Sequence, residues 1–203
     1  ATLEARWLEG AQWLCEEILA RFRDPDSGVF FDTAHDAEAL IVRPRDPMDN
    51  ATPSGASLTA ELLLRAGRIL DDTRYLDAAH TIVEEEADAL ARFGPAFGRM
   101  LSVLDRELST PVEIAIVGGR DDATAALVRA AHERFLPGGV IAGRLDEETP
   151  APERGLLAGR NRVEGAATAY VCENYACSLP VRDTRGLRAA LREIDGPLRS
   201  TPE

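Results

Sequence analysis

The sequence contains no hydrophobic run that approaches the roughly 18 to 20 residues of a membrane-spanning helix. It also has no basic stretch, because its arginines are interleaved with acidic residues and the net charge of the 203 residues is −12. Nucleic-acid affinity depends on lysine and arginine neutralising phosphates, so we expect no nucleic-acid binding and no membrane insertion. Hydrophobic residues still make up 45% of the chain, which is enough to form a buried core.

Cysteine is also scarce, with only Cys15, Cys172 and Cys177 present. An odd, sparse count does not describe a disulfide framework, so a reducing, cytoplasmic setting is expected. Cys172 and Cys177 are interpreted first as structural thiols. A disulfide or redox pair is the alternative if a turn after Glu173 brings them together. A metal site is disfavoured because no further Cys or His lies nearby in the sequence, and no cofactor is expected.

The first half of the chain has the three- and four-residue hydrophobic spacing of amphipathic helices. In the first helix, Trp7 and Leu14 are expected to face inward with Cys15. Short links between the later helices indicate antiparallel helical hairpins. A short strand is predicted at 40–42. The predicted helices span residues 2–22, 54–71, 73–91 and 95–108.

After Pro111 the pattern changes to strand, helix, strand, which predicts a small α/β unit with parallel strands and a right-handed crossover. The fold class is therefore mostly α, with a parallel three-stranded α/β subdomain. The domains are predicted as 1–110 and 111–203. The strands are expected at 112–117, 140–145 and 167–172, with an extension at 179–181, and the helices at 121–135 and 184–194.

Two groups of motifs, far apart in the sequence, resemble those of the YyaL-type, spermatogenesis-associated, thioredoxin-domain-containing proteins. The motifs are GVFFDT at 28–33, RPRD at 43–46, DNATPSG at 49–55, ATAYVC at 167–172 and ACSLPV at 176–181. One position departs from the family pattern, since Ala56 stands where an asparagine is usual.

The resemblance implies a parent several times longer than this chain, with the chain as its C-terminal portion. The non-Met residue Ala1 is accordingly expected to mark a fragment boundary. Residues 1–110 would then be the last helical hairpins of an (α/α)6 barrel similar to six-hairpin glycosidases and sugar epimerases. The expected partners are the remaining barrel helices, the family's thioredoxin-like domain and a carbohydrate ligand.

The polar segment from Asp24 to Ser57 is a long connection, and long connections often carry function. Its acids could supply the two carboxylates that glycosyl chemistry needs. The candidate general acids and bases are Asp32, Asp36 and Asp49, with Glu38 and Asp46 also present in the loop. The competing interpretation is that these acids cap helices and close turns.

Six further residues of this segment are candidates for ligand contact. Aromatic rings could stack on a sugar, a histidine could exchange protons, and amide and hydroxyl groups could bond to sugar hydroxyls. These residues are Phe30, Phe31, His35, Asn50, Thr52 and Ser54. The sequence thus predicts a carbohydrate isomerase, epimerase or glycosidase-like protein, with a non-catalytic interaction or redox-adaptor scaffold as the alternative.

Overall fold

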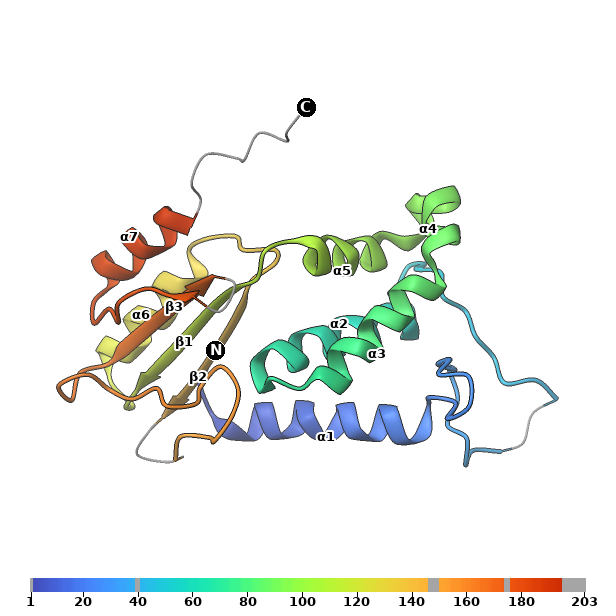
Figure 1. Ribbon diagram of the computed structural model, residues 1–203, viewed down its shortest axis with the longest axis horizontal. Coiled ribbons are helices and arrows are strands. Elements are labelled where there is room, and N and C mark those ends of the chain that lie inside the picture. The colour runs from blue at the N-terminus through green and yellow to red at the C-terminus, as the bar shows by residue number, and fades with distance from the viewer. Residues whose placement is uncertain (1, 39–40, 146–149, 174–175, 195–203) are drawn as a thin grey trace. The chain divides into compact units, whose positions relative to one another are not determined.

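A computed structural model describes residues 2–38, 41–145, 150–173 and 176–194 (Figure 1). The chain divides into two compact units. The helical unit comprises Arg6–Ser109, and the α/β unit comprises Ala1–Ala5 together with Thr110–Glu203. Within the residues described, no helix is both long and apolar enough to cross a membrane.

The helical unit is built around the packing of α2 against α3 and α5. Ser54 begins α2 by accepting a hydrogen bond from the Ser57 N–H at 3.0 Å. Asp72 caps α3 in the same way through the Arg74 N–H. The core includes Leu63, Tyr75, Ile82, Phe97 and Met100. The elements are α1 (Ala5–Arg21), α2 (Gly55–Leu70), α3 (Thr73–Glu85), α4 (Ala87–Phe93), the short 3-10 helix η1 (Gly94–Phe97) and α5 (Gly98–Leu108).

The single helix predicted at 73–91 is interrupted at Glu86, whose φ and ψ of −98° and 2° leave the helical region. The side chain of Glu86 is buried, and it forms an ion pair with Arg45 at 2.8 Å. A contact from the distant loop therefore stabilises a break that local periodicity does not reveal.

Two other local expectations are wrong. Trp7 and Leu14 are 63% and 46% exposed, because α1 buries only Cys15 and packs mainly through Ile18 and Leu19. In the described part of the segment 40–42, where a strand was predicted, Ile41 and Val42 are exposed in a bend and form no strand. Leu40 lies outside the described residues.

The α/β unit contains a four-stranded sheet in the order β2-β1-β3-β4. Strand β1 pairs in parallel with β2 through the α6 crossover, whereas β3 pairs antiparallel with β1, and β4 antiparallel with β3. A single bridge from Ala169 to Val181 lies where the extension at 179–181 was expected. The elements are β1 (Val112–Gly118), α6 (Asp122–His132), β2 (Val140–Leu145), β3 (Thr168–Glu173), β4 (Ala176–Cys177) and α7 (Thr184–Ile194).

The prediction of a purely parallel, three-stranded sheet is therefore wrong. Strand β2 ends at Leu145, which pairs with Gly118, and β3 begins at Thr168, which pairs with the neighbouring Val117. The connection from β2 to β3 thus starts and finishes at the same end of the strands, and its described residues, 150–167, contain no helix. If β3 were parallel to β1, the connection would have to cross to the opposite end of the strands. Because it does not, β3 runs antiparallel to β1.

The two faces of the sheet have different coverings, since alternate side chains of a strand point to opposite faces. On one face Val112, Ile114 and Ile116 form a hydrophobic core with residues of α6 and α7, the two helices that lie beside the sheet in Figure 1. The other face, which carries Glu113 and Cys172, is covered by the segment 150–167. This second face holds the cysteine pair.

Candidate functional site

Asp49 fastens the polar loop to two helices. Its carboxylate accepts hydrogen bonds from the backbone N–H groups of Ser54 at 2.8 Å, Arg99 at 2.7 Å and Met100 at 3.2 Å. Burial alone would raise the pKa of Asp49, but these hydrogen bonds, with one from Ser57, hold it below its usual range. Asp49 therefore serves the N-termini of α2 and α5 as an ionised acceptor.

Asp32 and Asp46 act within the loop itself. The carboxylate of Asp32 accepts the Asp46 N–H at 2.8 Å, while the Asp32 N–H donates to the Pro44 carbonyl at 3.0 Å. Asp46 in turn accepts the Met48 N–H at 3.1 Å. A Cβ at Gly55 would approach Asp32 to 3.2 Å, so Asp32 also lies beside the first turn of α2.

Asp36 and His35 are tied to the end of α1. Asp36 pairs with the Arg21 guanidinium at 3.0 Å, and this contact lowers the pKa of the carboxyl group. The His35 backbone N–H donates to the Arg21 carbonyl at 2.8 Å, and its ring Nδ1 lies 3.1 Å from the same oxygen. Both residues are exposed. The contacts described here join them to Arg21 of α1 and not to the other candidate acids of the loop.

The two phenylalanines differ in environment. Phe30 is 7% exposed and belongs to the hydrophobic core, so its ring offers no face to a ligand. Phe31 is half-buried, and the Arg43 guanidinium lies 4.1 Å from the centre of its ring. Arg43 is held there by a hydrogen bond to the Thr33 carbonyl at 2.6 Å. One face of the Phe31 ring is thus already covered.

Among the polar candidates, only Ser54 has a buried side chain. Its hydroxyl accepts the Ser57 N–H and donates to the Ser57 hydroxyl at 2.9 Å. Asn50 and Thr52 are exposed, and the Asn50 N–H donates to the Thr52 carbonyl at 3.1 Å in a tight turn. Of these three polar candidates, therefore, Asn50 and Thr52 keep their side chains accessible.

A hollow of about 420 Å³ lies beside the start of the loop. Of the residues predicted from the sequence, only His35 lines it. The candidate acids instead have separate partners: Asp36 pairs with α1, Asp32 bonds within the loop, and Asp49 accepts N–H groups at the N-termini of α2 and α5. The lining residues are Leu19, Ala20, Arg23, Pro25 and His35.

A second hollow, of about 410 Å³, was not anticipated from the sequence and lies between α3, α4 and α5. We call it the apolar groove. Leu101 within it is 39% exposed and Leu108 is 78% exposed. The hydrophobic spacing of these helices predicts one apolar face that packs in the core. An apolar face wider than the core can cover is the sequence signal that could have indicated this groove. The groove is lined by His80, Val83, Glu84, Ala87, Leu90, Ala91, Leu101, Leu104, Glu107 and Leu108.

His80 and Glu107 form a polar rim on the apolar groove. The His80 Nδ1 lies 2.6 Å from the Glu107 carboxylate, and its Nε2 lies 3.1 Å from Glu84. The hydrogen bond to Glu107, helped by the charges of both carboxylates, raises the pKa of His80.

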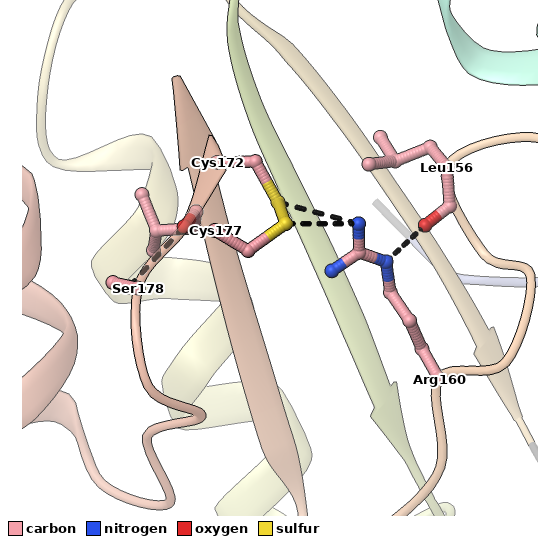
Figure 2. Close-up of a disulfide and its surroundings, with 6 residues drawn as sticks. Leu156, Arg160, Cys172, Cys177 and Ser178 are labelled. Carbon is pink, nitrogen blue, oxygen red and sulfur yellow. Dashed lines mark hydrogen bonds between the residues drawn. A yellow bond between two sulfur atoms is a disulfide. The ribbon is translucent and has the colours of Figure 1, made fainter. Parts of the chain in front are cut away.

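Cys172 and Cys177 form a disulfide, so their interpretation as structural thiols is wrong (Figure 2). Their residues lie directly opposite each other in the antiparallel register of β3 and β4. An unbroken strand would place them on opposite faces, but the hairpin reverses the chain and brings them together. Cys172 is 1% exposed, whereas Cys177 is an exposed residue.

Arg160 approaches the disulfide from the segment that covers this face of the sheet (Figure 2). Its Nη2 lies 3.2 Å from the Sγ of Cys172 and 3.4 Å from the Sγ of Cys177. Its Nε donates to the Leu156 carbonyl, and its guanidinium lies 5.2 Å from the centre of the Tyr170 ring. Sequence reasoning missed Arg160, because nothing local indicates which strand residues its loop covers.

The surroundings of Arg160 are polar and partly buried. The Tyr170 hydroxyl donates to the Asn161 carbonyl at 2.7 Å, and Arg144 donates to the Asn161 side chain at 3.0 Å. Glu113 is 8% exposed, lies opposite Cys172 in the register and interacts electrostatically with Arg160. Burial lowers the pKa of Arg160, while the charge of Glu113 opposes that change. A cation and an anion therefore flank the disulfide.

No group of three or more potential metal ligands occurs among the residues described. The candidate chemistry of the chain therefore rests on the loop, the apolar groove and the disulfide.

No family model matches the chain. It is 32% identical over 195 residues to spermatogenesis-associated protein 20 of Homo sapiens, a match that covers 94% of this chain and 25% of the human protein. It is 30% identical over 197 residues to the Mus musculus protein of the same name, covering 95% of this chain and 25% of that protein. The chain thus spans about a quarter of the length of the curated relatives it matches.

These similarities accompany a chain of the mixed helix-and-sheet class, with a helical unit and a small α/β unit. Its similarity to spermatogenesis-associated protein 20 extends over nearly the whole chain and agrees with the family resemblance that its two groups of motifs indicated.

Proposed function

We propose that this chain is a non-catalytic interaction module and that another part of the longer protein docks in its apolar groove. The observation that carries the proposal is that the loop acids are occupied by the chain's own donors. Asp32, Asp36 and Asp49 accept hydrogen bonds from Asp46, Arg21 and three backbone N–H groups. A general acid or base would have to give up these contacts, whereas a scaffold needs them.

The apolar groove supplies a surface for such docking. Leucine side chains of α4 and α5 line it together with Val83 and two alanines, and exposed apolar patches of this kind typically mark interaction sites. Acidic rim residues Glu84 and Glu107 favour a partner with basic residues flanking an apolar segment. The relatives are about four times as long as this chain, so the longer protein has other segments able to fill the groove.

By the family resemblance, the docking segment belongs to the remaining helices of an (α/α)6 barrel or to the thioredoxin-like domain. The helical unit would then be part of that barrel. The resemblance favours this arrangement because the motifs of the family occur in this chain in the same order.

The test is to produce this chain and the remainder of the longer protein as two polypeptides and to measure their association by calorimetry. We expect association that Leu101→Lys weakens at least tenfold, since a charge would be buried in the groove. Leu179→Lys is the matched control, because Leu179 is 86% exposed and lies in the α/β unit. Absence of association, or equal effects of both substitutions, would refute the proposal.

A second candidate function is carbohydrate binding, with isomerase, epimerase or glycosidase-like chemistry in the longer protein. The observation in its favour is the hollow lined by Arg23 and His35, which offers a cation and a proton carrier beside the polar loop. Calorimetry of the full-length protein against a panel of sugars tests it, with His35→Ala as the variant. Binding that His35→Ala abolishes would support this candidate over the first. Uniform absence of binding would eliminate it.

We propose a cytoplasmic location, on the argument from scarce cysteine. A disulfide in that compartment is usually transient and functional, which makes the cysteine pair of particular interest. Immunofluorescence of the full-length protein with compartment markers checks the location, and a signal confined to an oxidising compartment would contradict it.

A further inference from the structure

We infer that the Cys172–Cys177 disulfide is a redox-active site that exchanges with an external dithiol, with Cys177 as the sulfur attacked and Cys172 as the leaving group held by Arg160. The site lies wholly in the α/β unit, so the inference is independent of the docking proposed for the helical unit. Its basis is the asymmetric environment of the two sulfur atoms.

Access distinguishes the two cysteines. Thiol–disulfide exchange requires a thiolate to reach a sulfur atom. Cys177 is exposed, in the short edge strand β4, whereas Cys172 is 1% exposed beneath the segment 150–167. An incoming thiolate therefore reaches Cys177.

Stabilisation of the negative charge also makes Cys172 the leaving sulfur and Cys177 the attacked one. When the attacked bond breaks, its electron pair goes to the Sγ of Cys172, which becomes a buried thiolate. The Nη2 of Arg160 already lies 3.2 Å from this atom, so a guanidinium N–H can donate to the new negative charge without moving far (Figure 2). The leaving group is therefore stabilised by a cation at a residue that is itself buried.

The position of Arg160 is fixed by its own contacts. Its Nε is held by the Leu156 carbonyl, and its planar group lies near the Tyr170 ring. A guanidinium held in this way loses little side-chain entropy when it binds a thiolate. Glu113, opposite Cys172, balances the cation and opposes the formation of a second negative charge.

The exchange balances with a dithiol as the reductant. One thiolate of the dithiol forms a bond to the Sγ of Cys177, and the Cys172–Cys177 bond breaks to give the Cys172 thiolate. The second thiol of the dithiol then attacks its own first sulfur and releases the Cys177 thiolate. The dithiol is oxidised to a disulfide, the cysteine pair is reduced by two electrons, and the two protons pass to the protein thiols.

The first test measures the rate of reduction of the whole chain by dithiothreitol, followed by alkylation and mass spectrometry. We expect Arg160→Gln to slow reduction about tenfold, as for the loss of one charge-assisted hydrogen bond. Arg160→Lys should retain part of the rate. Glu113→Gln should increase the rate, because it removes a negative charge beside the leaving sulfur. The control is Arg154→Gln, an exposed arginine of the same segment, which should reduce at the wild-type rate.

The opposite signs expected for the Arg160 and Glu113 variants separate this mechanism from simple loosening of the fold, which would speed reduction in both. Natively folded Arg160→Gln that reduces as fast as the Arg154→Gln control would overturn the inference. So would a disulfide that dithiothreitol reduces only after unfolding in urea.

The second test identifies the attacked sulfur. The oxidised chain is treated with glutathione, quenched in acid and fragmented, and the glutathione adduct is located by mass spectrometry. We expect the adduct on Cys177. An adduct on Cys172, or equal amounts on both cysteines, would overturn the assignment of the attacked and leaving sulfur atoms.

Discussion

Asp49 and Arg99 are joined by a hydrogen bond of 2.7 Å, in which the backbone N–H of Arg99 donates to the Asp49 carboxylate. A residue of the polar loop thereby satisfies a free N–H group at the beginning of α5. The same carboxylate serves Met100 and, at α2, the N–H of Ser54. Since helix N-termini favour negative charge, one side chain stabilises the beginnings of two helices and the part of the polar loop that leads into α2.

We expect Asp49→Asn to lower the free energy of unfolding by about 1 to 2 kcal/mol, because an amide NH₂ would face backbone N–H donors. Urea unfolding followed by circular dichroism measures the change. Asp26→Asn, at an exposed turn position, serves as the control and should be close to neutral.

The pH dependence of Asp49 follows from its depressed pKa. A carboxyl group with a lower pKa in the folded state stabilises the fold above its unfolded value of about 3.9, and this stabilisation is lost as the pH falls through the folded value. The stability difference between wild type and Asp49→Asn should therefore shrink below about pH 4. A difference that stayed constant down to pH 2 would contradict the assignment.

The contact between Tyr75 and Glu16 predicts a coupled effect on stability. The hydroxyl of the fully buried Tyr75 donates to the Glu16 carboxylate at 2.5 Å, joining α3 to α1. Tyr75→Phe should lower the free energy of unfolding by about 1 kcal/mol, since Glu16 is partly exposed and the gain is screened. In a double-mutant cycle with Glu16→Gln the losses should not add. Glu17→Gln, next in the chain, should show additive behaviour with Tyr75→Phe.

Cys15 should be unreactive in the folded protein. It is fully buried, and burial raises its pKa to about 11, assisted by the charges of Glu16 and Asp72. The reactive thiolate is therefore scarce at pH 8. We expect iodoacetamide to leave Cys15 unmodified in native protein and to alkylate it completely in denaturant. Rapid native alkylation would show that α1 detaches from the core.

His80 should make the stability of the helical unit depend weakly on pH. Its pKa is raised by the hydrogen bond to Glu107, so the stabilisation is fully present below the unfolded value of about 6.5 and is lost as the pH rises through the folded value. Between pH 6 and pH 8 the melting temperature of wild type should fall relative to Glu107→Gln by about 1 to 2 °C, because the pair is exposed. Parallel pH profiles of the two proteins would rule out this coupling.

The local elements of the fold were largely predictable from the sequence. The helix at 184–194 and the strand at 140–145 occupy the predicted residues, since Leu187 and Leu191 recur at helical spacing and glycines precede the strand. The direction of β3 was not predictable, because it depends on where a long connection returns to the sheet.

The candidate site shows the same division. The capping role of Ser54 follows from its place before a helical pattern. By contrast, the contacts of Asp49 with Arg99 and of Arg160 with Cys172 join residues whose proximity only the tertiary fold establishes. Burial also reverses the simple interpretation of Phe30, whose aromatic ring is part of the core.

Leu3 packs in the core of the α/β unit, and a Cβ added at Gly143 would lie 2.4 Å from its side chain. The α/β unit is therefore discontinuous in sequence, and the helical unit is inserted within it. A contact of such high sequence separation carries a large loop-closure cost until the intervening chain has become compact. The topology therefore favours one order of folding, in which the helical unit completes its own core first. Once that unit is compact, a shorter length of flexible chain separates Leu3 from the sheet, and the contact costs less entropy.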